Sequence, residues 1–158
     1  MTRDYANEIS KTLREYVKFY NDFLLFEQNI FEAVEQNKLN LLDDLVKQEE
    51  AFVLKSRGME QNRMQSQADA GFADSKLRDL IDEAPEDMKE ELQTMFKQLN
   101  EIVNNIQHVN ERCNIAIKAR LSAIDRAMEK IKSEEEQKTY DDSASSHKNG
   151  KTFFSDKV

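Results

Sequence analysis

The sequence predicts an all-α fold, and three observations lead to this class. The 158 residues include only three glycines and one proline, which leaves few positions for the turns of a β-rich fold. Leu, Glu, Lys, Gln, Ala and Met, which favour helices, dominate the composition. Apolar residues recur at steps of three and four along most of the chain. We therefore expect an antiparallel bundle of three long helices plus one short helix, with the last helix overhanging its partners.

The first helix is predicted to run from Thr2 to Gln36 and to carry a wide apolar face. At about 100° per residue, its apolar and aromatic side chains fall on two adjacent arcs. The first arc contains Ile9, Leu13, Tyr16, Val17, Tyr20, Leu24, Phe31 and Val34, and the second contains Phe19, Phe23, Phe26 and Ile30. A helix with one partner needs a narrower stripe. We expect this helix to pack against two neighbours, or against one neighbour and a second molecule.

The second helix should follow a sharp turn at QNKLN, residues 36–40, with Asn40 as its N-cap, and end near Gln67. Its predicted inner side consists of Leu42, Leu45, Val46, Phe52, Val53, Met59 and Arg63. Gly58 lies inside this helix and marks either a close helix–helix approach or a mild weak point. The small and polar residues of ADAGFADS, residues 68–75, predict a loop.

A short helix, SKLRDLIDEA, should precede Pro85, which fits the first turn of the last helix. The apolar stripe of that last helix continues from Met88 to Ile131, about 65 Å at 1.5 Å per residue, whereas the first two helices reach only about 50 Å and 40 Å. The overhanging part, Ile117 to Ile131, then has no partner in its own chain, although the short helix could cover some of it. The acidic run SEEEQ, residues 133–137, should be a solvated, fraying helix end, because acidic charge there opposes the helix dipole. We expect a helical bundle domain at residues 1–138 and a polar, flexible tail at residues 139–158.

The composition argues against several classes of function. A net charge of −8 repels phosphate backbones and anionic lipid, and the longest apolar run is far too short to span a membrane, so we expect neither nucleic-acid binding nor membrane insertion. The N-terminus has no apolar signal segment, which favours a cytoplasmic protein. The single cysteine, Cys113, has the phase of the apolar stripe and should be buried, while His108 should be solvated. We expect no catalytic residues, no metal site and no cofactor.

Several segments resemble the flagellar export chaperones of the FlgN type. The helix–turn–helix AVEQNKLNLLDDLVKQEEAFVLKSRGMEQNR has Asn37, Leu39, Leu42 and Arg63 at comparable places, although Asn37 and Lys38 replace the usual glycine and acidic residue of the turn. VNERCNIAIKARLSAIDRAMEKI is similar to the family's asparagine pair, Asn110 and Asn114, followed by a long amphipathic helix. GFADSKLRDLIDEAPEDM and the tail TYDDSASSHKNG also have counterparts in that family. The resemblance extends from about Tyr5 to Gly150.

The resemblance implies a non-enzymatic cytoplasmic chaperone that holds hook–filament junction proteins and delivers them to the flagellar type III export gate. The terminal helices of those clients would lie on the overhanging stripe, at Ile117, Leu121, Ile124, Met128 and Ile131. The resemblance further implies that Tyr140 contacts the cytoplasmic domain of the export gate. From the residues alone, a tyrosine packed against the last turn of its own helix is an equal alternative, and Phe153 and Phe154 have no assigned role.

A second reading belongs to another class of protein. The same stripe and the aromatic face of the first helix also suit a self-associating structural coiled coil without a client, so the sequence leaves a homodimer open.

Overall fold

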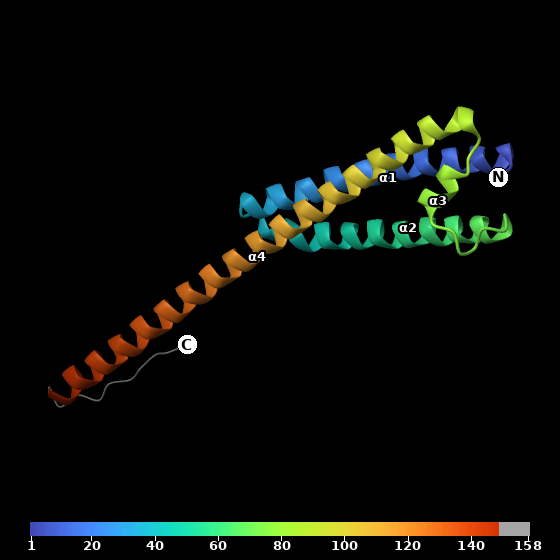
Figure 1. Cartoon of the computed structure of the whole chain (residues 1–158). Helices are drawn as coiled ribbons and strands as arrows, with labels where there is room; N and C mark the ends of the chain where they lie inside the picture. Colours follow the sequence, from blue (N-terminus) through green and yellow to red (C-terminus); the bar gives the residue numbers. More distant parts are fainter. Residues whose placement is uncertain (149–158) are drawn as a thin grey trace. The chain divides into compact units, whose positions relative to one another are not determined.

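The computed structural model describes residues 1–148, and it confirms the all-α class (Figure 1). The elements are α1 (Arg3–Glu35), the 3-10 turn η1 (Leu39–Leu41), α2 (Leu42–Asp69), α3 (Leu77–Asp82) and α4 (Glu86–Lys148), with no strand among the described residues. The three long helices and the short one are those that the sequence predicts. The chain divides into two compact units, Met1–Asn114 and a second unit that begins at Ile115 within α4.

In the first unit, α1 contacts both other long helices, which confirms that its wide apolar face has two neighbours. Toward α2, the hydroxyl of Tyr16 donates to the backbone oxygen of Met59 over 2.9 Å. Toward α4, Arg14 pairs with Glu91. The chain direction makes α1 antiparallel to α2 and parallel to the first part of α4 (Figure 1).

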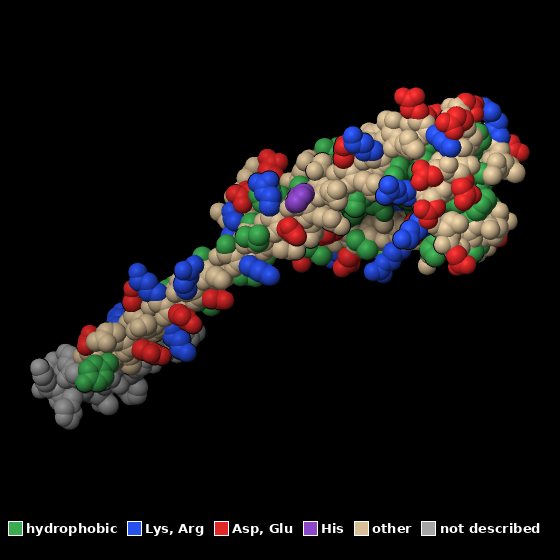
Figure 2. All heavy atoms as spheres, in the orientation of Figure 1, with side chains coloured by type: hydrophobic (Ala, Val, Ile, Leu, Met, Phe, Trp, Pro, Cys, Tyr) green, Lys and Arg blue, Asp and Glu red, His purple; other side chains and the backbone are tan. Residues whose placement is uncertain are grey.

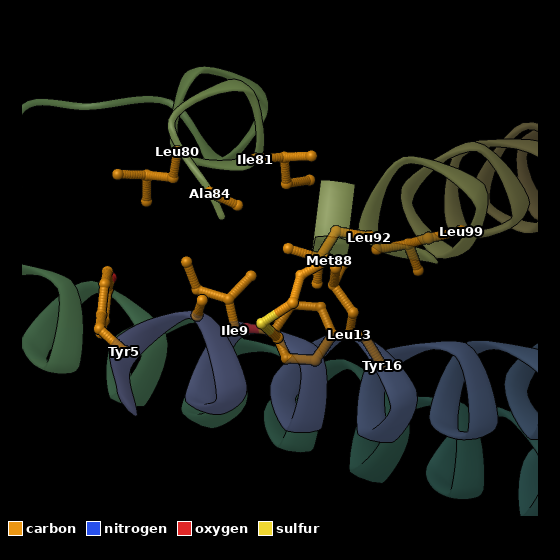
Figure 3. Close-up of a cluster of buried hydrophobic side chains, with 11 residues drawn as sticks. Tyr5, Ile9, Leu13, Tyr16, Leu80, Ile81, Ala84, Met88, Leu92 and Leu99 are labelled. Carbon is orange, nitrogen blue, oxygen red and sulfur yellow. The ribbon is translucent and has the colours of Figure 1, made fainter. Parts of the chain in front are cut away.

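The hydrophobic core gathers where the start of α1 meets α3 and the first turns of α4 (Figure 3). Leu13 and Leu92 are fully buried there, and α3 contributes Leu80 and Ile81, each 1% exposed. The apolar side chains of α3 are thus already covered within the first unit. The remaining members of the cluster are Tyr5, Ala6, Ile9, Tyr16, Ala84, Met88 and Leu99.

Aromatic rings join α1 to α2 further along. Phe52 of α2 lies against Phe23 and Phe26 of α1, with ring centroids 5.1 Å and 5.0 Å apart. Apart from this contact α2 is thinly covered, because Gln67 is its single buried residue. The predicted inner side of α2 is wrong at Val46 and Val53, which are exposed. The covered line includes polar residues instead, among them Ser56, whose hydroxyl hydrogen-bonds to Tyr20.

Both turns that flank α2 use a residue in the left-handed region. Asn37 has φ 55°, and the backbone N–H of Lys38 donates to the oxygen of Ala33, closing a Schellman motif. Asparagine tolerates this conformation better than most residues, so it fills the place of the usual glycine. Gly71, with φ 88°, ends α2 in the same way. The predicted N-cap at Asn40 is wrong, because η1 absorbs that residue and α2 begins at Leu42 without a side-chain cap.

The loop after α2 is held by a side chain that the periodicity did not single out. Gln67 donates through its amide nitrogen to the backbone oxygens of Phe72 and Ser75 and accepts a hydrogen bond from Arg63. The ring of Phe72 stacks on Tyr5 of α1 at 5.4 Å. These contacts place the loop so that α3 can cover the core.

The last helix ends later than predicted. We expected the acidic run at residues 133–137 to fray, but α4 continues through it to Lys148 and so includes the first ten residues of the predicted tail. Acidic side chains oppose the helix dipole only near the terminus, and the terminus lies well beyond them. Thr139 donates to the backbone oxygen of Glu135, and Gln137 to the Asp141 carboxylate, both within one turn. The remaining residues, 149–158, which include Phe153 and Phe154, lie outside the described part of the chain.

Candidate functional site

The apolar stripe of α4 lies in two different environments. Within the first unit it forms part of the core, as far as Cys113, which is 4% exposed as predicted. In the second unit the stripe remains in phase but its side chains are open to solvent. Leu121, Ile124, Met128 and Ile131 are 43% to 63% exposed, and Ile117 is half-buried. The predicted client-binding residues are therefore brought together on one face of α4, and most of that face is uncovered.

Charged side chains surround the apolar residues in this part of α4 (Figure 2). Arg126 folds back so that its Nε donates to the backbone oxygen of Ser122, over 3.3 Å. Lys118, Lys130 and Lys132 have no carboxylate within 4.0 Å among the described residues. The face thus combines exposed apolar area with unpaired ammonium groups.

The two asparagines of the predicted family motif lie at the end of the first unit, where one of them contacts a buried acid. The side-chain amide of Asn114 donates to Oδ1 of Asn110 over 3.2 Å, and the amide of Asn110 donates to Oε2 of Glu27 over 3.4 Å. Glu27 is 1% exposed, and its Oε1 has no hydrogen-bond partner among the described atoms. The carboxyl of Glu49 of α2 neighbours Glu27. Three helices therefore meet at this polar junction, which we define as Glu27 of α1, Glu49 of α2, and Asn110 and Asn114 of α4.

Burial and the neighbouring Glu49 carboxyl raise the pKa of Glu27 to about 7. The loss of hydration disfavours the charged form, and the protonated form can donate to Glu49. Burial also raises the pKa of the Cys113 thiol, with the two glutamates as the next causes. A thiol with a raised pKa in an apolar stripe is a poor nucleophile.

The remaining expectations from the sequence concern a metal site, His108, membrane insertion and Tyr140. The described residues include no group of three or more His, Cys, Asp and Glu side chains that could hold a metal ion. His108 is exposed, as predicted. None of the described helices is both long and apolar enough to cross a membrane. Tyr140, the predicted contact for the export gate, lies on α4 with 73% of its surface exposed.

A family model described as FlgN protein matches residues 1–148. The chain belongs to the FlgN family. No curated protein and no solved structure matches it. FlgN proteins are flagellar export chaperones, and a chaperone of this family binds substrates of flagellar export. The match covers the first unit, continues into the second, and includes the exposed stripe, the asparagine pair and Tyr140.

Sequence reasoning missed two residues of this FlgN-family chain. Glu27 lies seven residues after Tyr20 and seven before Val34, so it has the phase of the α1 apolar arc. A single acidic residue in phase with an apolar stripe is the signal that could have found it. Gln67 gave no such signal, because its role depends on the loop that folds over it.

Proposed function

We propose that this FlgN-family chaperone binds the terminal helical segments of hook–filament junction proteins and delivers them to the export gate from the cytoplasm. The observation that carries the proposal is the exposed stripe of Leu121, Ile124, Met128 and Ile131. An amphipathic client helix would lay its own residues at i, i+3, i+4 and i+7 along this face. Each half-exposed side chain that becomes covered contributes roughly 1 kcal/mol. Binding would also hide client surface that otherwise aggregates.

The substitution Ile124→Asp tests the stripe directly. A carboxylate at its centre must either be desolvated on binding or block the client helix, so client capture should be lost. Because Ile124 is 43% exposed, helicity should remain. Ser122→Asp provides the matched control, since it introduces the same charge about 160° away around the helix and should leave capture unchanged. Capture can be measured by co-purification with a hook–filament junction protein, and helicity by circular dichroism. Loss of the whole fold in Ile124→Asp, or equal capture by both variants, would contradict the proposal.

Tyr140 is the proposed contact with the cytoplasmic domain of the export gate. An exposed ring with a hydroxyl offers area and a hydrogen bond at low cost in side-chain entropy. Tyr140→Ala should weaken binding to the isolated gate domain and leave client affinity unchanged, both measurable by titration calorimetry. If the two affinities fall together, the stripe and the tyrosine do not have separate roles.

Self-association through the stripe is the alternative. Light scattering over a hundred-fold dilution series distinguishes the two functions, since a client site must be free in the resting protein. A dimer that survives dilution and excludes the client would support a structural coiled coil instead.

A further inference from the structure

The second unit contains a charge pattern that the rest of the protein lacks. The first unit has 14 basic and 23 acidic side chains, whereas residues 115–132 have five basic and two acidic ones. The five cations are Lys118, Arg120, Arg126, Lys130 and Lys132, and the acids are Asp125 and Glu129. The exposed apolar stripe therefore lies in a locally basic segment of an acidic chain.

The cations are also placed where they can act on an occupant of the stripe. At about 100° per residue, Arg120 and Lys132 lie about 60° to either side of the stripe, and Lys118 lies about 100° from it. Among residues 115–132, Asp125 is the single acid within about 100° of the stripe, and Glu129 lies about 120° from it. Arg126 and Lys130 lie about 180° and 140° away, on the opposite face. Lys118 and Lys132 lie on the same side of the stripe and have no carboxylate within 4.0 Å among the described residues, so this edge is complementary to a helix with an acidic edge.

We propose that the stripe of α4 selects an amphipathic helix whose apolar face is bordered by Glu and Asp. This inference rests on the proposed function and specifies the chemistry of the client. Opposite charges at the border would steer the encounter and fix the register of the client helix, while the apolar contacts supply most of the affinity. Clients whose helices have lysine-rich borders are disfavoured at the same site by like-charge repulsion.

Two other occupants fit this face less well. An anionic membrane prefers a basic helix with aromatic residues on its apolar side, and residues 115–132 contain none. A second copy could offer its acidic block, Glu134–Glu136. In that block Glu135 occupies the angular position of the stripe, so the block supplies no apolar side chain to pack against the stripe of its partner.

Two synthetic peptides test the selection. Both have the same leucines at i, i+3, i+4 and i+7; one has glutamates along its borders and the other has lysines. Fluorescence anisotropy with the full chain should give a dissociation constant at least about five-fold lower for the glutamate peptide at low salt. The difference should shrink at high salt, where screening shortens to a few ångströms.

Charge-reversal variants with a matched control then test whether the cations beside the stripe cause the preference for the glutamate peptide. The double variant Lys118→Glu/Lys132→Glu should bind the lysine peptide more tightly than the wild type does, a gain that unfolding cannot produce. Arg126→Glu/Lys130→Glu changes the net charge by the same amount on the opposite face, and it should retain the preference for the glutamate peptide.

The outcomes separate this inference from the proposed function. Equal affinity for both peptides overturns the charge selection and leaves client binding intact, provided that Ile124→Asp abolishes both. Binding of neither peptide refutes both proposals. Binding to phosphatidylglycerol-containing vesicles in place of either peptide identifies a lipid surface and overturns the inference, as does a dimer that blocks both peptides.

Discussion

The buried acid at the polar junction makes the stability of the first unit depend on pH in a direction that can be worked out. Glu27 has a pKa of about 7 in the folded protein, above its ordinary value of 4.5. The folded state thus holds a proton that the unfolded state releases between these two values. The free energy of unfolding should therefore fall as pH rises from about 4.5 to about 7, and the full loss should be present above that range.

Replacing Glu27 with glutamine should remove the fall in the free energy of unfolding that the wild type shows as pH rises. One pKa unit corresponds to about 1.4 kcal/mol, so the shift sets an upper limit of about 3 kcal/mol, and relaxation of the surroundings reduces it to roughly 2 kcal/mol. A glutamine can still accept from Asn110 and can donate to Glu49. We expect Glu27→Gln to be more stable than the wild type at pH 8 by this amount and similar to it at pH 5.

Urea unfolding followed by circular dichroism at pH 5, 6, 7 and 8 measures the effect. The control Glu111→Gln removes an exposed carboxylate of α4 and should leave the pH dependence of the wild type unchanged. A Glu27→Gln variant that is less stable than the wild type at pH 8 would refute the reasoning. It would show that the carboxylate is charged and satisfied in the folded protein. The reasoning would also be refuted if the free energies of unfolding of the wild type and Glu27→Gln changed with pH in the same way.

Two further substitutions probe the backbone. Gly58 lies within α2 and a Cβ there would meet nothing within 4 Å, so Gly58→Ala should raise the free energy of unfolding by about 0.5–1 kcal/mol in the same urea assay; destabilisation would reveal the close helix approach that this geometry argues against. Asn37 has a positive φ, and both Asn37→Ala and Asn37→Gly remove its side chain, so Asn37→Ala should be less stable than Asn37→Gly by about 1 kcal/mol because only glycine adopts this φ without strain. Equal losses in both variants would point to the asparagine side chain instead.

Helix order and the neighbours of α1 could be predicted because long apolar periodicities report directly on buried faces. The change from core to exposed stripe near Cys113 also follows from helix lengths alone. The inner face of α2 could not be predicted in this way. Its covered positions include Ser56, which hydrogen-bonds to Tyr20 of α1, and Glu49, which lies beside Glu27 of α1, while Val46 and Val53 are exposed. Apolar residues do not identify the covered face of α2, because α1 presents tyrosine hydroxyls and a buried acid to that face.

The end of α4 was missed for a different reason. The acidic residues looked like a terminus because their charge opposes the dipole, yet no glycine or proline follows them until Gly150. Glycine or proline readily interrupts the backbone hydrogen bonds of a helix. Acidic charge alone changes the free energy of the helix by only tenths of a kcal/mol per residue. Tyr140 therefore lies on a helix, with a direction fixed by the helical phase.

The thin burial of α2 has a consequence for how the first unit opens. Gln67 is the one buried residue among the 28 of this helix, whereas α1 and the start of α4 share the core cluster. The free energy needed to detach α2 should thus be well below that of global unfolding, and its amide protons should exchange with solvent in a separate, faster class. In such an opening Phe52 would leave the aromatic contact with Phe23 and Phe26, exposing a second apolar surface on α1 while α1 and α4 remain paired.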